Sequence, residues 1–292
     1  MPSRTELRTT LTSYLARHPA ESGPLAPVHA ALDATHSGPA TVTCSAVVID
    51  RDGKVLHVPD SHTGSGLPRT TPQDSDRNLL ATALRAIREQ TGIQPGDLCL
   101  TPQYLRTPID ITPAPGAADT PIADFRFAFY LARTAHAEAS WRPALDPRGK
   151  ATALDGQPVP LNASALIYNS RGEYLLHLRD MRDDIWAPGC WALLGGGHEA
   201  GDLTPEDTVR RELREEAGIH PEQLETFLDE EILDADGLTL PVRIFCALWE
   251  GDPAQLPLTE GVMLAWFPPA TVPRLRLGGE TLALVQRHAS KA

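Results

Sequence analysis

The sequence predicts an α+β fold, an α/β/α sandwich with a mixed sheet between helices, and it predicts this fold twice in tandem. Three observations support the prediction. A hairpin pattern, a helix with a closing glycine and a later apolar strand each occur twice along the chain, in the same order. The 292 residues are long enough for two ordinary hydrophobic cores. We therefore expect two similar domains that follow one another along the chain.

The first half begins with residues 1–38, whose opening MPSRTELRTTLTSYLARHP is typical of a short amphipathic helix. Two apolar runs around a polar turn in SAVVIDRDGKVLHV, at 45–58, predict a hairpin. A helix follows in LRAIREQTGIQPGDL at 84–98, and a strand in DFRFAFYLA at 124–132. The proline-rich residues 107–123 predict no regular structure.

The second half repeats these elements. SALIYNSRGEYLLHL at 164–178 predicts the hairpin, RRELREEAGIHPEQL at 210–224 the helix, and PVRIFCALW at 241–249 the strand. A further helix is expected near the end of the chain, where Leu282 and Val285 show helical spacing.

Composition sets the expected boundaries. Residues 142–160 are polar and rich in proline and glycine, which is typical of a linker. We expect a helical segment at 1–38, a first domain at 39–143, a linker at 144–160 and a second domain at 161–292.

Charge and hydropathy exclude several classes of protein. The net charge is −12 without a basic run, which argues against binding to a nucleic-acid polymer or to an anionic membrane. The sequence has neither an apolar run of about 18 residues, as a membrane span requires, nor a signal-peptide pattern. We therefore expect a cytoplasmic protein. The widely spaced cysteines are expected to be reduced core thiols: Cys44, Cys99, Cys190 and Cys246.

The helix of the second half has clear start and stop signals. Thr204 suits the N-cap, Pro205 the first helical position and Gly218 the residue after the last turn. Val209 and Leu213 are spaced for a buried face.

Three carboxylates share another face of this helix. Glu212, Glu215 and Glu216 fall at i, i+3 and i+4, where like charges repel by about 0.2–0.5 kcal/mol per pair. A hard divalent cation such as Mg²⁺ would offset this repulsion, because it prefers oxygen ligands. Arg211, four residues before Glu215, is placed to fix that carboxylate. The alternative is a solvated helix with Arg–Glu pairs.

A glycine loop precedes the helix and favours the metal. In WALLGGGHEAGD, at 191–202, an apolar strand runs into Gly195, Gly196 and Gly197. Glycines allow the backbone to approach a metal-bound phosphate closely. The strand, the loop and the carboxylate helix together predict a site for a small phosphorylated molecule.

These residues resemble the signature of the Nudix hydrolases, G-x5-E-x7-R-E-U-x-E-E-x-G-U with U aliphatic. The run RELREEAGI at 211–219 matches it without exception. The front half departs from it, because five residues after Gly196 lead to Asp202 rather than to glutamate, and eight rather than seven residues then precede Arg211.

The resemblance implies an Mg²⁺-dependent enzyme, with Mn²⁺ as a possible substitute, that cleaves the pyrophosphate bond of a nucleoside diphosphate linked to another group. A nucleoside triphosphate or a nucleotide sugar is the favoured substrate. The metal ligands would be Glu212, Glu215, Glu216 and the Gly196 carbonyl, with Arg211 orienting the carboxylates. The general base stays open among two helix residues, Glu212 and Glu216, and the later Glu260.

The candidate substrate contacts are spread over several elements: Arg179, Trp191, Gly195, Gly196, Gly197 and Glu199. The expected partner is a small-molecule nucleotide, and the sequence leaves a homodimer open. Two other functions are considered: a nucleotide-binding sensor without turnover, and an isomerase of the same fold acting on a prenyl diphosphate.

The first half resembles the same family but lacks most of the carboxylates. Alignment through Arg85 places Ala86 at the position of Glu212 and Gln90 at that of Glu216. Arg69, Thr70 and Thr71 then occupy the glycine positions. We therefore expect a degenerate domain that keeps the fold without a catalytic metal.

Overall fold

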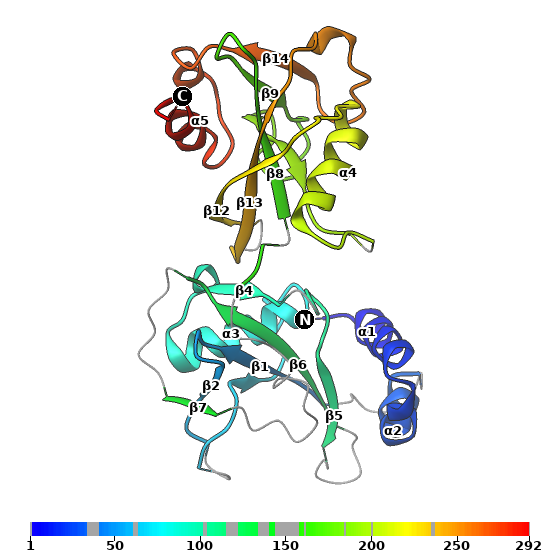
Figure 1. Cartoon of the computed structure of the whole chain (residues 1–292). Coiled ribbons are helices and arrows are strands. Elements are labelled where there is room, and N and C mark those ends of the chain that lie inside the picture. Colours follow the sequence, from blue (N-terminus) through cyan, green and yellow to red (C-terminus); the bar gives the residue numbers. More distant parts are fainter. Residues whose placement is uncertain are drawn as a thin grey trace. The chain divides into compact units, whose positions relative to one another are not determined.

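The computed structural model divides the chain into two compact units, residues 1–158 and 159–292 (Figure 1). It describes residues 2–33, 41–60, 64–101, 104–114, 122–133, 140–143, 158–160, 162–183, 185–199, 201–234 and 237–291. Within those ranges, none of the helices combines the length and the apolar character that a membrane crossing requires.

The first unit opens with helices α1 (Arg4–Arg17) and α2 (Ser22–Asp33), joined by a short 3-10 turn. Pro19 explains why one continuous helix does not form, since the residue before a proline is disfavoured in the helical region; His18 lies outside it, at φ −128° and ψ 65°. The Tyr14 hydroxyl on α1 donates to Asp110, and Glu6 accepts from the Leu79 amide, so α1 is tied to the rest of its unit.

The remaining helix of the first unit is α3 (Leu79–Thr91), followed by a 3-10 turn at Pro95–Asp97. Its strands are β1 (Thr41–Ile49), β2 (Lys54–His57), β3 (Arg69–Thr70), β4 (Leu98–Leu100), β5 (Asp110–Ala114), β6 (Ile122–Leu131) and β7 (Ser140–Pro143). The hairpin expected at 45–58 and the strand at 124–132 are confirmed as β1–β2 and β6. The helix expected in 84–98 is confirmed as α3, which begins earlier, at Leu79, and ends at Thr91.

The expectation of no regular structure across residues 107–123 is wrong at its centre. Asp110–Ala114 form β5, which pairs antiparallel with β6. Ile109 and Ile111 are buried there, so core packing outweighs the proline content of the segment. Residues 115–121, and residues 144–157 of the expected linker, lie outside the described residues.

The second unit contains helices α4 (Pro205–Ala217) and α5 (Thr281–Ala289), with 3-10 turns at Pro253–Gln255 and Val272–Arg274. Its strands are β8 (Asn162–Tyr168), β9 (Tyr174–Leu178), β10 (Trp191–Ala192), β11 (Leu194–Gly196), β12 (Glu225–Leu233), β13 (Thr239–Leu248) and β14 (Met263–Phe267). The four elements expected in this half, the hairpin, the two helices and the later strand, are confirmed as β8–β9, α4, α5 and β13.

The strands of the two units pair in the same pattern. In the second unit β8 is antiparallel to β9 and β11 and parallel to β13, which is in turn antiparallel to β12. In the first unit β1 is antiparallel to β2 and β3 and parallel to β6, which is antiparallel to β4 and β5. Each unit therefore has a mixed sheet, as the repeat in the sequence predicts.

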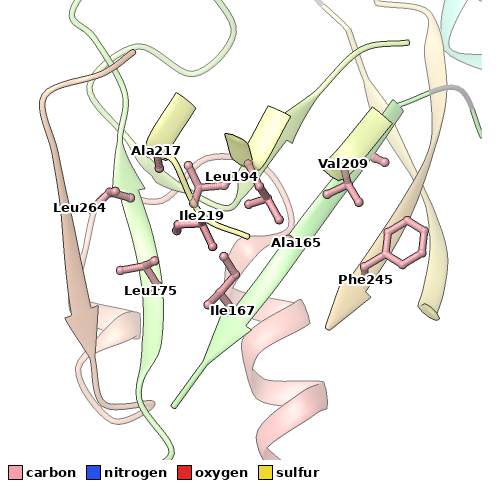
Figure 2. Packing of buried hydrophobic residues seen from close by; sticks show 11 residues of the cluster. Ala165, Ile167, Leu175, Leu194, Val209, Ala217, Ile219, Phe245 and Leu264 are labelled. Atoms are coloured by element: carbon pink, nitrogen blue, oxygen red, sulfur yellow. The ribbon is translucent and has the colours of Figure 1, made fainter. Parts of the chain in front are cut away.

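The core of the second unit has two layers, one on each face of its sheet. Successive residues of β8 alternate between them, so that Ala165 and Ile167 pack under α4 while Leu166 packs toward α5. Figure 2 shows the first layer, in which Val209 and Ala217 of α4 face the strands. This packing fixes α4 against the sheet and leaves its charged face for the site.

All four cysteines are free and buried, as expected from their spacing.

Candidate active site

Helix α4 begins and ends at the residues its signals predict. The Thr204 hydroxyl accepts from the Asp207 amide at 3.2 Å, and the Asp207 carboxylate accepts from the Thr204 amide at 2.9 Å, which completes a capping box. Gly218 closes the helix at φ +64°, where a glycine is favoured.

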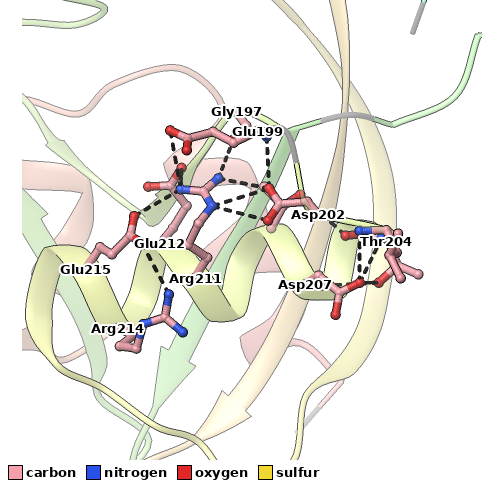
Figure 3. Close-up of polar contacts among 11 residues, drawn as sticks. Gly197, Glu199, Asp202, Thr204, Asp207, Arg211, Glu212, Arg214 and Glu215 are labelled. Carbon is pink, nitrogen blue, oxygen red and sulfur yellow. Dashed lines mark hydrogen bonds and ion pairs between the residues drawn. The ribbon is translucent and has the colours of Figure 1, made fainter. Parts of the chain in front are cut away.

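Arg211 is the centre of a hydrogen-bonded network on this helix (Figure 3). Its Nε and one terminal nitrogen donate to the Asp202 carboxylate, at 3.2 and 3.0 Å. The other terminal nitrogen donates to Glu212 at 2.9 Å and to Glu215 at 3.2 Å. A bond of 2.7 Å to the Gly197 carbonyl ties the glycine loop to the helix. The arginine therefore fixes two of the three expected carboxylates, as predicted for Glu215.

Asp202 takes the position where the family signature has glutamate, and its side chain is almost buried against Arg211. The hydrogen bonds from Arg211 lower the pKa of Asp202 to about 2. Asp202 therefore stays ionised and holds the arginine.

The backbone of the glycine loop packs closely against β8 and against the side chain of Glu212. Strand β11 pairs antiparallel with β8, and Gly195 has φ +141°, where a side chain would overlap the Ala163 carbonyl. A Cβ on Gly196 would overlap the Glu212 carboxylate. Gly195 therefore lets the loop backbone pass the Ala163 carbonyl, and Gly196 leaves room for the Glu212 carboxylate in its present position.

Glu216 is buried beside other carboxylates. It is only 4% exposed, and the Gly195 amide donates to it at 3.2 Å. Burial raises its pKa to about 8, and the negative charges of Glu212 and Glu260 add to the effect. Burial also raises the pKa of Glu212. In the described part of the chain, no ion pair includes Glu216. A buried carboxylate among like charges favours a cation at this place.

Glu260 enters the site from the loop before β14. Thr259 fixes this loop to the end of α4, because its amide donates to the Glu216 carbonyl at 2.9 Å and its hydroxyl to the Glu215 carbonyl. The exposed Glu260 side chain makes no hydrogen bond or ion pair with any described residue. Its charge nevertheless raises the pKa of both Glu212 and Glu216, so it lies near them.

A cavity of about 250 Å³ opens beside the glycine loop. Its floor is apolar, with Val242 and Ile244 of β13 and Leu284 of α5, and polar groups line its edges. Arg179 and Trp186 lie together on one wall, where the Arg179 Nε donates to the Trp186 carbonyl at 2.7 Å and the guanidinium lies 5.9 Å from the indole centroid. An apolar floor with a few polar groups is typical of a pocket for a small molecule.

The predicted site residues are gathered only in part. Gly195, Gly196, Gly197 and Arg179 line the cavity, whereas Trp191 packs edge-on against Phe267 at 4.7 Å. Glu199 is exposed and lies 3.8 Å from Arg211.

The three expected metal ligands do not face one point. Glu212 and Glu215 face Arg211, while Glu216 faces the Gly195 amide. Within the described ranges, no group of three or more acidic, histidine or cysteine side chains has the geometry of a metal site.

Two residues of the site carry no sequence signal that singles them out. Trp186 is one of several tryptophans, and only the fold brings it to the cavity. His177 lies in β9, and the fold places its ring against the loop that carries Glu260.

Residues 158–287, which lie almost entirely in the second unit, match the model of the NUDIX domain. No curated protein matches this chain. Similar solved structures include the NUDIX domain of Shewanella oneidensis NrtR complexed with ADP ribose, which is 23% identical over 50% of this chain and 92% of that chain, with a TM-score of 0.40. A MutT NUDIX hydrolase from Burkholderia pseudomallei is 25% identical over 44% of this chain and 97% of its own, with a TM-score of 0.37. A MutT protein from Methanosarcina mazei Go1 is 20% identical over 46% of this chain and 95% of its own, with a TM-score of 0.39.

Proposed function

We propose that the Nudix domain of the second unit is a pyrophosphohydrolase, which cleaves a nucleoside diphosphate linked to another group in an Mg²⁺-dependent reaction. A nucleoside triphosphate or a nucleotide sugar is the favoured substrate class. One observation carries the proposal: Glu216 is buried beside Glu212 and Glu260 without an ion pair among the described residues, next to a glycine loop that opens into a cavity.

The chemistry of the donor set fits a divalent cation, although the three carboxylates do not converge on one point in the described structure. Glu212, Glu215 and Glu216, with the Gly196 carbonyl, offer the oxygen ligands that Mg²⁺ prefers. Glu212 packs on Gly196, and Arg211 donates to one of its two carboxylate oxygens, so that the other would bind the metal. When bound, Mg²⁺ supplies polarisation of the phosphoryl oxygens and neutralises the charge that develops on them; Mn²⁺ is expected to substitute for it.

The protein residues then divide the remaining tasks. Arg211 holds Glu212 and Glu215 in place, and the cavity takes the nucleoside. Arg179, whose Nε donates to the Trp186 carbonyl, is proposed to bind a phosphate of the substrate with its terminal nitrogens. Glu199 is proposed to contact the substrate from the exposed end of the loop.

We assign the general base to Glu260. Glu212 accepts from Arg211 and Glu216 accepts from Gly195, whereas Glu260 is exposed and its carboxylate makes no such bond with the described residues. A water attacks phosphorus, the bond to the leaving phosphate breaks, and Glu260 accepts the proton of the water.

The first unit is proposed to be a degenerate Nudix domain without a metal. The same strand pairing and the same arginine network support this assignment, whereas Ala86 and Gln90 replace two carboxylates. A cytoplasmic location and a homodimer stay predictions.

The test is hydrolysis of a panel of nucleoside triphosphates, nucleotide sugars, ADP-ribose and dinucleoside polyphosphates with Mg²⁺, and separation of the products. Release of a nucleoside monophosphate is expected, and the variant with Glu215→Gln and Glu216→Gln is expected to abolish it. Absence of turnover, with tight binding of one nucleotide retained, would favour a nucleotide sensor instead.

A further inference from the structure

The loop that carries Glu260 is attached at both ends. On one side Thr259 binds the last turn of α4 through the Glu215 and Glu216 carbonyls. On the other side the Gly261 amide donates to Asp180 at 3.3 Å, and the Val262 amide donates to the Leu178 carbonyl at 2.8 Å. These bonds place the loop between α4 and β9.

His177 supplies the attachment at Glu260 itself. Its Nε2 lies 2.9 Å from the Glu260 carbonyl. Because a carbonyl only accepts, Nε2 carries the proton and donates it. The ring also determines the residue that follows, since a Cβ on Gly261 would overlap the imidazole. The backbone on both sides of the Glu260 Cα is therefore set by one side chain.

The burial of the His177 ring costs folding free energy, and the bond to the loop is what the structure gains in return. The ring is 1% exposed, and its Nδ1 is buried without a hydrogen-bond partner among the described residues. A buried polar atom without a partner destabilises the fold. In the first unit the matching hairpin position, five residues after the turn glycine, holds the buried Val58. The hairpin therefore forms with an apolar residue at this position, and the hairpin itself does not require the histidine.

We propose that His177 is a positioning residue, which holds the Glu260 carboxylate near Glu212 and Glu216 by binding the backbone of its loop. This inference rests on the proposed hydrolase function and on Glu260 as the general base. The imidazole itself makes no contact with substrate in this role, because it is buried in the sheet behind the loop.

The test is a double-mutant cycle between His177 and Glu260, measured with the best substrate of the panel. His177→Leu is expected to lower kcat about 10-fold, the size of effect typical of a lost supporting bond, with little change in KM. His177→Gln, which keeps an N–H donor, is expected to restore most of the loss. Glu260→Gln is expected to lower kcat about 100-fold or more. In that background His177→Leu is expected to have no further effect.

Two controls separate positioning from stability. Leu176→Ala, on the same strand and buried on the other face, is expected to lower the melting temperature without lowering kcat. Gly261→Ala keeps His177 but displaces the loop, and its effect on kcat is likewise expected to vanish in the Glu260→Gln background. Gly261→Ala is also the second variant should His177→Leu fold poorly.

Amide hydrogen exchange of residues 256–263 in metal-free protein gives a readout independent of turnover. Faster exchange at Val262 in His177→Leu, but not in Leu176→Ala, is expected. The inference would be overturned if His177→Leu lowered kcat equally in the unmodified protein and in the Glu260→Gln background. It would also be overturned if His177→Leu changed neither kcat nor the amide exchange of the loop. A fully active Glu260→Gln beside an inactive Glu216→Gln would overturn it while the hydrolase function stands, and absence of turnover in the unmodified protein would overturn both.

Discussion

Helices α3 and α4 carry the same arginine network and differ in the carboxylates around it. Arg85 donates to Asp76 through its Nε at 3.0 Å, to the Thr71 carbonyl at 2.7 Å and to Glu89 at 3.2 Å. Arg211 makes the equivalent bonds to Asp202, Gly197 and Glu215 in the second unit. The network is present in both units and therefore belongs to the fold.

The two units differ at a carboxylate position and at the loop position that packs against it, and the two differences go together. In the second unit Glu212 lies against Gly196, where a Cβ would overlap it. In the first unit Ala86 stands in place of that glutamate, and Thr70 replaces the glycine. The small alanine leaves room for the side chain of Thr70.

The third difference is an amide in place of the buried carboxylate. Gln90 accepts from the Arg69 amide at 3.4 Å, as Glu216 accepts from the Gly195 amide. It also donates to the Arg69 carbonyl at 2.7 Å, a bond that a carboxylate cannot make. The amide fixes the loop to the helix without a cation. The comparison supports the proposal that Glu212 and Glu216 serve the reaction, because the first unit forms the same strand pairing without these two carboxylates.

The largest expected effect comes from making the second unit resemble the first. Glu216→Gln is expected to lower kcat by more than about 100-fold. Loss of a residue that only supports a metal ligand already lowers activity by about 10–100-fold, and Glu216 is proposed to be a ligand itself. Steady-state hydrolysis of the best substrate measures it. Gln90→Ala is the matched control and is expected to leave kcat unchanged; equal loss in both variants would contradict the division between the units.

The arginines are expected to be equivalent in stability and different in activity. Arg85→Ala and Arg211→Ala each leave a nearly buried aspartate without its cation, which costs about 3–5 kcal/mol. Urea unfolding is expected to show this loss in the transition of the affected unit, and only Arg211→Ala is expected to lower kcat as well. A loss of kcat in folded Arg85→Ala protein would assign the first unit a part in the reaction.

Substitution of Gly196 in the glycine loop is expected to have a smaller effect on kcat. Gly196→Ala is expected to lower kcat about 10-fold or more, because the added Cβ displaces the Glu212 carboxylate from the loop. Thr70→Gly, the reverse exchange in the first unit, is expected to leave kcat unchanged. Unchanged kcat in Gly196→Ala would show that Glu212 has no fixed place in the site.

The smallest expected effect is on acid stability, and it is shared by both units. Burial raises the pKa of Asp76, but its hydrogen bonds, those from Arg85 foremost, outweigh this and leave the pKa below 3.8; the pKa of Asp202 falls to about 2. A lowered folded-state pKa means that the contribution is complete above 3.8 and is lost as the pH falls through the folded value. Urea unfolding between pH 5 and pH 2.5 is expected to show the decline. Asp76→Asn and Asp202→Asn are expected to flatten it, each in its own unit; an unchanged slope in either variant would show that its aspartate contributes nothing.

Local signals in the sequence predicted most of the fold. Caps at Thr204 and Gly218, the hairpins and the buried face of α4 depend on neighbouring residues, so the pattern along the chain contains them. Strand β5 was missed because its backbone is held by pairing with β6, a contact that no local pattern reveals.

The candidate site was predictable where it is contiguous. The loop and helix from Gly195 to Glu216 form one run of sequence, and Arg211 binds Glu215 as its spacing predicts. The cavity and the attachment of Glu260 to His177 join segments far apart in the chain, 83 residues in the second case. The sequence does not distinguish Trp191, which packs against Phe267, from Trp186, which lines the cavity.

The most direct measurement is a calorimetric titration of the metal-free protein with Mn²⁺, in the unmodified protein, in the variant with Glu212→Gln and Glu216→Gln, and in Glu206→Gln. Glu206 lies on the same helix and pairs with Arg210, away from the glycine loop. Saturable binding in the unmodified protein and in Glu206→Gln, and its loss in the double variant, is the predicted result. Binding of equal strength and stoichiometry in the double variant would contradict the assignment of the metal to α4.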